Sequence, residues 1–276
     1  MIRFFDKAAI LAASDKEVEE AGAPALRNPW RLCIVTHVEE LKILVRMLPL
    51  WATIVFFYAV SAQLSSTFVE QGMAMDTAVG SVRVPPASLS TFDVLTIVVL
   101  VPLYDRAFVP AARRLTGRGK GVSDLQRIGA GLAMPALAMA AAALVETERL
   151  RAAKAQAPTT KTSVLWQAPQ YALVGVGEVL TTIGQLDFFY SQAPAAMKTV
   201  CTGLGLLAIA AGDYLSSFLL TAVEWATATG GRPGWIPDDL DEGHLDRFFW
   251  MMAGLGFLNL VAFGSCAVRY KSRKNS

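Results

Sequence analysis

Six long apolar segments divide this chain and restrict it to one broad kind of fold. Each segment reaches the roughly 20 residues that a helix needs to cross about 30 Å of hydrocarbon. Of the 276 residues, 54% are hydrophobic and only 17% are charged, whereas a soluble domain is roughly 25% charged. We therefore predict an all-α polytopic membrane protein with six transmembrane helices. The predicted helices are 43–64, 89–111, 125–145, 164–189, 197–223 and 245–268.

The same segments set the predicted division of the chain. Residues 1–40 mix acids, bases and prolines without an apolar core of the length that a secretory signal has. They are interpreted as a cytoplasmic linker that contains an amphipathic segment. Residues 41–268 form the six-helix transmembrane bundle, and residues 269–276 form a cytoplasmic tail.

The distribution of basic residues predicts the orientation of the chain in the membrane. With six spans, both termini lie on one side. Most lysines and arginines outside the spans fall on that side, and the 146–163 loop is the exception. Because cytoplasmic loops carry an excess of bases, both termini are expected in the cytoplasm. Topology thus explains the basic runs, and we expect no nucleic-acid partner.

The sequence contains no recognisable arrangement of catalytic or metal-binding residues. There is no P-loop, HExxH or GxSxG motif. The cysteines Cys33, Cys201 and Cys266 are too far apart to suggest a metal pair or a disulfide set. No metal-ligand spacing joins His37 and His244. We expect a protein that is not an enzyme and that holds no metal.

One carboxylate, Glu178, lies near the middle of the 164–189 segment and is the strongest functional signal. An ionised acid at the bilayer centre costs about 2.5–3.5 kcal/mol on insertion scales, so it persists mainly where it meets a cavity, a partner or a proton path. Thr181, Thr182 and Gln185 follow it at helical spacing and make a partly polar stripe. Either Glu178 is a structural acid paired to a neighbouring helix, or it binds and releases a proton. The second interpretation favours membrane transport.

Other candidate residues share a location inside the predicted spans. Asp213, past the middle of the 197–223 segment, is a second intramembrane acid that either pairs with a base or faces a cavity. Phe57, Ser61 and Ser65 repeat every four residues and could line a cavity. Serines inside helices often only bond their own backbone, which is the alternative here.

Asp105 and Arg106 stand at the end of the second predicted span. An acid beside a base at a helix end can latch helices together and open during transport. A static ion pair at the membrane interface is the alternative.

Short sequence motifs occur along nearly the whole chain. They are VEELK at 38–42, RMLPLWA at 46–52, PPASL at 85–89, PLYDR at 102–106, LQR at 125–127, WQAPQY at 166–171, GE at 177–178, GQLDFFY at 184–190, GWIP at 234–237, GHLD at 243–246 and RYK at 269–271. Together they resemble the plant nitrate/peptide transporters, a family of proton-dependent oligopeptide transporters. GHLD and RYK look most like the di- and tripeptide branch.

The resemblance implies a proton-coupled symporter of the major facilitator superfamily, in which twelve helices form two six-helix halves. This chain is similar to the C-terminal half. In the family, the first half carries an ExxER proton-coupling motif and a lysine that pairs with the acid matching Glu178, and in peptide-transporting members this acid helps to hold the peptide amino terminus. The resemblance therefore implies di- and tripeptide transport by alternating access, with the proton as coupling ion and no other cofactor. The implied partners are the lipid bilayer, a small peptide substrate and the missing N-terminal half.

Two departures from the family pattern bear on the cargo. Ser61 stands where the nitrate-transporting member has a histidine and peptide transporters commonly have tyrosine. Asp213 stands where peptide members usually have asparagine, and an added acid favours cations and repels anions. Nitrate or another plant metabolite remains an alternative cargo, and a truncated, non-transporting membrane fragment remains an alternative function. Both the plasma membrane and the vacuolar membrane remain open as locations.

Overall fold

The computed structural model describes residues 35–116, 122–154, 162–193, 197–228, 234–237 and 239–270. Most of the predicted cytoplasmic linker, residues 1–34, and the tail from residue 271 onward lie outside the described residues. The first helix already begins at Val35, inside the range predicted for the linker.

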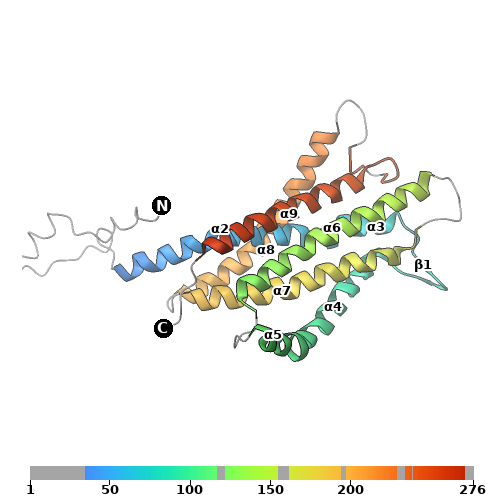
Figure 1. Ribbon diagram of the computed structural model, residues 1–276. Helices are drawn as coiled ribbons and strands as arrows, with labels where there is room; N and C mark the ends of the chain where they lie inside the picture. Colours follow the sequence, from blue (N-terminus) through green and yellow to red (C-terminus); the bar gives the residue numbers. More distant parts are fainter. Residues whose placement is uncertain are drawn as a thin grey trace, which may run out of the picture.

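The described chain is almost entirely helical (Figure 1), and one short hairpin interrupts the helices. The helical segments are α2 (Val35–Ser61), η2 (Ala62–Ser65), α3 (Thr67–Met73), η3 (Pro86–Leu89), α4 (Ser90–Leu103), the π-helix η4 (Tyr104–Phe108), α5 (Val109–Thr116), α6 (Asp124–Lys154), η5 (Val164–Gln167), α7 (Ala168–Gln192), α8 (Lys198–Thr227) and α9 (Leu245–Arg269). The hairpin consists of β1 (Ala78–Val79) and β2 (Val82–Arg83), which pair antiparallel.

Six helical stretches in the described residues are long and apolar enough to cross a membrane, which confirms the predicted fold class. Each predicted range overlaps one of them, but the helices are longer than predicted. Helix α6 has 31 residues, or about 46 Å at about 1.5 Å per residue, against about 30 Å of hydrocarbon. Its last turns are charged, and i,i+3 ion pairs join Arg149 to Glu146 and Arg151 to Glu148. Charged residues that end an apolar segment therefore do not end the helix, because they pair along its surface.

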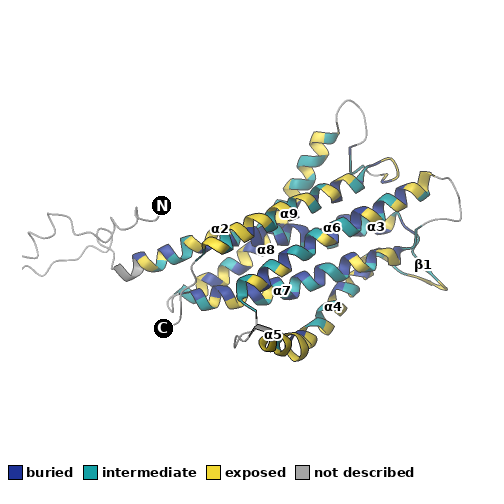
Figure 2. Ribbon diagram, in the orientation of Figure 1, coloured by how far each residue is buried: buried dark blue, intermediate teal, exposed yellow. Residues whose placement is uncertain are grey.

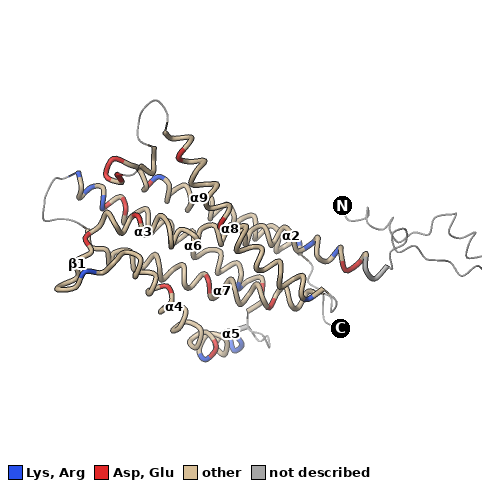
Figure 3. The backbone as a smooth tube through the Cα atoms, turned by 180° about the vertical axis from the view of Figure 1, so that it is seen from behind, with Lys and Arg blue, Asp and Glu red and all other residues tan. Residues whose placement is uncertain are grey.

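The helices form an elongated bundle whose two ends differ (Figure 1). Helix α6 packs along α7 and α9, α2 packs along α8 and α9, and α4 packs along α7. Helix α2 begins and α9 ends at one end of the bundle, called here the terminal end. The β1–β2 hairpin lies at the opposite end, called here the hairpin end. Charged residues gather toward the two ends, and few occupy the middle (Figure 3).

The interior of the bundle has two apolar clusters. The cluster toward the hairpin end contains fully buried Phe68, Tyr171 and Phe249, whose rings meet edge to edge at 5.4 and 5.7 Å between centroids. The second cluster includes Ile54 and Ile128 and lies toward the terminal end. Aromatic pairs in this arrangement add to the energy of burial alone. The two clusters hold α2, α6, α7 and α9 in fixed positions around the middle of the bundle.

Helices α4, α8 and α9 are much less covered than α2, α6 and α7 (Figure 2). Only 17% of the apolar window of α4 and of α8 and 22% of that of α9 is buried, against 44% for α2 and α6 and 50% for α7. The exposed face of α4 is apolar and includes Val94, Val98 and Leu103. The exposed face of α8 also carries polar residues, among them Asp213 and Ser217. In a membrane these faces meet lipid or another polypeptide.

Candidate functional site

Glu178 lies on α7, half-buried, where α7 faces both α2 and α4. Tyr58 of α2 and Asp93 of α4 both lie within electrostatic range of its carboxylate. Tyr58 donates a hydrogen bond of 3.3 Å to Oε1 of Gln185 and has Thr182 as a second side-chain partner. Glu178, Thr182 and Gln185 belong to the polar stripe predicted on this helix, whereas Thr181 of that stripe is buried against Gly131 of α6. Three helices therefore contribute to one polar site in the middle of the bundle.

Asp93 is the residue of this site that the sequence interpretation missed. Its side chain is buried, and Oδ1 has no hydrogen-bond partner among the described residues. It approaches α7 at Gly175, where a Cβ atom would lie 2.8 Å from Oδ1 and 2.9 Å from the backbone oxygen of Asp93. Because only glycine leaves room for this contact, α4 can bring its acid close to Glu178.

Neither acid is balanced by a base within the described part of the chain. No ion pair there involves Glu178 or Asp93. Two carboxylates in one partly buried site disfavour each other's ionised form, so the site favours a proton or a cation. The site can therefore bind a positive charge in the middle of a membrane.

The predicted cavity residues of α2 divide into two groups. Phe57 is buried, meets Tyr58 edge to edge at 5.2 Å, and lies against Gly177 one residue before Glu178. Ser61 is half-buried, and its hydroxyl has no hydrogen-bond partner among the described residues. Ser65 is exposed and donates to the carbonyl of Ala62. Because α2 ends at Ser61 and continues as the 3-10 helix η2, Ser65 leaves the face that Phe57 and Ser61 share.

Asp213 lies on the exposed face of α8 and makes no described contact with Glu178. Ser217 donates to the Asp213 carbonyl at 3.1 Å, and Thr221 donates to the Ser217 carbonyl at 3.0 Å, which forms an exposed polar stripe along the helix. The preceding residue, Gly212, packs against the backbone of Tyr58 and Ala59, where a Cβ atom would clash. Asp213 is thus level with the site on a neighbouring helix but faces away from this bundle.

At the terminal end, Asp105 and Arg106 are both exposed on the π-helix η4 and do not pair with each other. The observed ion pair joins Arg127 of α6 to Asp187 of α7 at 2.8 Å. The buried guanidinium of Arg127 also lies 5.2 Å from the centre of the Tyr104 ring. The tie between helices therefore involves Tyr104, the residue before the predicted pair, and neither Asp105 nor Arg106.

The sequence pattern of the POT family matches residues 6–236. The chain belongs to the POT family. It is 49% identical over 280 residues to Protein NRT1/PTR FAMILY 8.3 of Arabidopsis thaliana, covering 99% of this chain and 47% of that relative. Protein NRT1/PTR FAMILY 8.5 of the same plant is 45% identical over 272 residues, with 99% and 45% covered. The chain spans about half the length of the curated relatives it matches.

Solved structures of the POT family share this fold. A crystal structure of an auto-inhibited POT family peptide transporter superimposes with a TM-score of 0.71 at 27% identity, over 86% of this chain and 43% of that one. The POT family transporter PepTSo superimposes with a TM-score of 0.67 at 24% identity, over 84% and 43%. The chain is therefore a multi-pass membrane protein of a transporter family, as the sequence motifs predicted.

This POT-family chain has a second polar region at the hairpin end, where the acids are satisfied. Glu146 is fully buried and accepts hydrogen bonds from Arg149 at 2.8 and 3.0 Å and from Gln71 at 2.9 Å. Arg149 also binds Asp241 and the carbonyl of Leu240, which fastens the segment before α9 to α6. The network holds α3, α6 and this segment together.

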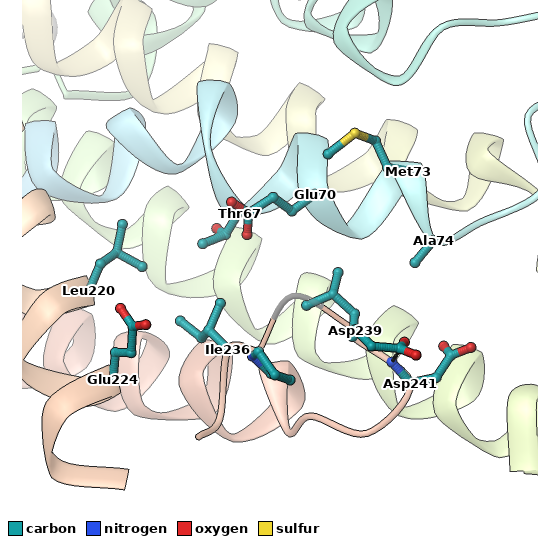
Figure 4. Close-up of a pocket in the computed structure, with 11 residues that line it drawn as sticks. Thr67, Glu70, Met73, Ala74, Leu220, Glu224, Ile236, Asp239 and Asp241 are labelled. Atoms are coloured by element: carbon teal, nitrogen blue, oxygen red, sulfur yellow. Dashed lines mark hydrogen bonds between the residues drawn. The ribbon is translucent and has the colours of Figure 1, made fainter. Parts of the chain in front are cut away.

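A cavity of about 750 Å³ opens beside this network (Figure 4). Residues of α3 line one side, and Glu224 of α8 and the segment before α9 line the other. Its acidic residues are Glu70, Glu224, Asp239 and Asp241. Since Asp241 already binds Arg149, the cavity shares one of its acids with the structural network.

Proposed function

We propose that this chain forms the C-terminal half of a proton-coupled symporter that carries di- and tripeptides by alternating access. The observation that supports the proposal is the pair of acids Glu178 and Asp93, which lies in the middle of the membrane and meets no described base. A peptide carries a protonated amino terminus, and a proton is the coupling ion of the proposed transport. The ammonium group and the proton both carry a positive charge, which no described base supplies to the two acids.

The acids give the site two ways to become neutral, which is the physical basis proposed for coupling. An ionised Glu178 binds a peptide ammonium through a charge-assisted hydrogen bond. Asp93 holds the proton at the same time, so the proton and the peptide cross the membrane together. Tyr58 and Gln185 hold this part of α7 against α2, so the carboxylate keeps its position. A site at the bilayer midplane that opens in turn to each side is the arrangement that alternating access requires.

An N-terminal half is part of the proposal. The exposed stripe of Asp213, Ser217 and Thr221 would be costly in contact with lipid, because charged residues inside the membrane generally face a cavity or another helix. A second six-helix half would cover this face of α8 and, following the family resemblance, bring a lysine to Glu178. We place both termini in the cytoplasm, with the plasma membrane and the vacuolar membrane as the two candidate locations.

An anionic cargo such as nitrate fits the site less well. Asp93, Glu178 and Asp213 all add negative charge at the level of the site, and each repels an anion. Another plant metabolite with an ammonium group would meet the same attraction as a peptide. The second candidate function is a membrane fragment that does not transport, and the half-length match to the relatives is the observation behind it.

The test joins this chain to the N-terminal half of Protein NRT1/PTR FAMILY 8.3, its 49%-identical relative. The fusion is expected to take up a labelled dipeptide when the outside is acidic, and Glu178→Gln is expected to lower that uptake at least tenfold. Glu148→Gln, at an exposed position of α6 away from the site, serves as the matched control. Proton-driven uptake by the Glu178→Gln fusion at the unchanged rate would refute the role of this acid. A fusion that reaches the membrane but carries none of dipeptides, nitrate or amines would support the non-transporting fragment.

A further inference from the structure

Helix α5 is an arm that extends from the terminal end of the bundle. It continues from the π-helix η4, and η4 is the element it packs against most extensively in the described part of the chain. In Figure 1 it lies at the foot of α4, below α7 and near the start of α6. The helices of the bundle core, in contrast, each pack along at least one long neighbour.

The base of this arm is held in place. Tyr104 and Phe108, one turn of the π-helix apart, stack at 5.2 Å between ring centres. Arg127 lies over the Tyr104 ring and is itself fixed by its ion pair with Asp187. Insertions that produce π-helical turns often lie at functional positions. Here the π-helix sets a defined direction for α5 as it leaves the bundle.

The surface of the arm carries both exposed bases and exposed apolar side chains. Arg106, Arg113 and Arg114 are exposed, and Leu103 and Phe108 are about half exposed. The one exposed acid of η4 and α5 is Asp105, which leaves the described part of the arm with a net positive charge. The sequence continues with Arg118 and Lys120, which lie outside the described residues.

The length of this span places the arm at the surface of the bilayer. The segment Pro86–Arg114 has 29 residues, or about 43 Å of helix, whereas the hydrocarbon layer is about 30 Å thick. With the apolar part of α4 inside the hydrocarbon, the basic residues fall in the headgroup layer. Amphipathic basic helices bind there through apolar burial and attraction to anionic lipids.

We propose that η4 and α5 form a binding site for anionic phospholipid headgroups. Arg106, Arg113 and Arg114 bind the lipid phosphates, and a guanidinium suits this role because it can donate two parallel hydrogen bonds to a phosphate group. Leu103 and Phe108 lie at the boundary of the acyl chains. This site is separate from the acids of α4 and α7, so it holds whether or not the chain carries peptides.

Native mass spectrometry of the full 276-residue chain tests the proposal. The chain is purified in mixed micelles with equal amounts of phosphatidylglycerol and phosphatidylcholine, and the ratio of the two lipids that stay bound is measured. Phosphatidylglycerol is expected to be retained preferentially. The double substitution Arg113→Gln/Arg114→Gln is expected to lower that ratio by about five-fold for each arginine removed.

The matched control removes two exposed bases at the other end of the molecule, with Arg151→Gln/Lys154→Gln on α6. This variant is expected to retain phosphatidylglycerol as the unchanged chain does. An equal ratio in the unchanged chain and the α5 variant would overturn the proposal, and so would an equal loss in the control. Inorganic phosphate at millimolar concentration is expected not to displace the lipid. Displacement would mean that the site takes phosphate in general and would overturn the assignment to lipid.

A depth measurement provides the second test. A spin label is attached at Ala111→Cys, an exposed position of α5, with Cys33 and Cys266 replaced by serine and buried Cys201 kept. In phosphatidylglycerol vesicles, collisions with oxygen and with a water-soluble nickel complex are expected to place the label in the headgroup layer. A label fully accessible from water would refute the proposal. A label that the N-terminal half shields in the fusion protein would assign this surface to a protein partner instead.

Discussion

Two groups of acids lie inside this bundle, and they differ in what surrounds them. At the hairpin end, Glu146 is fully buried, is paired with Arg149 and accepts a hydrogen bond from Gln71. In the middle of the bundle, Glu178 and Asp93 interact with each other, and neither forms an ion pair with a described base. Buried charges are tolerated when they are paired and hydrogen-bonded. The first group is therefore complete within this chain, and the second is not.

The difference separates stability from function. A buried network in which every polar group has a partner holds helices in place. Breaking it leaves a buried polar group without a partner, which lowers the free energy of unfolding. A site that has negative charge but no cation gains stability from whatever positive charge arrives. In a membrane, where polar groups are expensive, such an incomplete site marks a place for a ligand, a proton or another polypeptide. Four experiments test whether the two groups differ in this way.

The largest effect is expected from Arg149→Met. It removes the base and leaves Glu146 buried and unpaired, which costs about 3–5 kcal/mol when one partner of a buried pair is lost. The free energy of unfolding, measured by titrating the micelle-bound chain with dodecyl sulfate, is expected to fall by that amount. Arg151→Met, which breaks the exposed pair with Glu148 on the same helix, is the control and is expected to cost less than about 1 kcal/mol. Equal effects of the two substitutions would mean that the buried network does not stabilise the fold.

A smaller effect is expected from Gly175→Ala, which tests how the incomplete site is assembled. The added methyl group would meet Oδ1 and the backbone oxygen of Asp93, so α4 must move away from α7. Overpacking of this kind costs about 1–3 kcal/mol in the free energy of unfolding. Gly203→Ala on α8, where a Cβ atom meets nothing within 4 Å, is the matched control and is expected to stabilise by up to about 1 kcal/mol. An increase in the free energy of unfolding for Gly175→Ala, like that expected of the control, would show that α4 does not approach α7 this closely.

The sequence predicted the fold well because apolar length is a local property. The six spans follow from runs of hydrophobic residues, and the family follows from motifs that can be read along the chain. The C-terminal end of α6 was predicted too early, because the charged residues after Val145 continue the helix through their own ion pairs. Such pairs depend on neighbours three residues away and carry no apolar signal.

The site was predicted only in part because its members come from three helices. Glu178 and Gln185 share a helical face and could be found from spacing. Asp93 interrupts an apolar span in the same way as Glu178, and that signal could have identified it. Its proximity to Glu178 depends on the room left by Gly175, which no spacing rule reveals. The ion pair of Arg127 with Asp187 likewise joins positions far apart in the chain, whereas the adjacent Asp105 and Arg106 do not pair.

A double-substitution cycle with Asp93→Asn and Glu178→Gln measures the interaction within the incomplete site. Each single substitution is expected to raise the free energy of unfolding by about 1 kcal/mol, because it removes one of two like charges from a partly buried site. The second substitution is expected to add little, because the repulsion has already gone. The cycle is read at neutral pH in the same titration. Two losses of stability that simply add would show that the acids are independently satisfied and that the site is complete.

The smallest effect on stability is expected from Asp213→Asn. Its side chain is exposed on α8, so the free energy of unfolding of the isolated chain is expected to change by less than about 0.5 kcal/mol. In the fusion with the N-terminal half of the relative, the same residue would face the substrate path and attract cations. Uptake of a lysine-containing dipeptide relative to a glutamate-containing one is then expected to fall about five-fold, as for a unit charge removed at about 4 Å in water. Ser217→Ala, one turn further along the same exposed stripe, removes no charge and is expected to leave this ratio unchanged. An unchanged ratio in the Asp213→Asn fusion would show that the third acid does not select the cargo. Substantial nitrate uptake by the unsubstituted fusion that Asp213→Asn leaves the same would show this too.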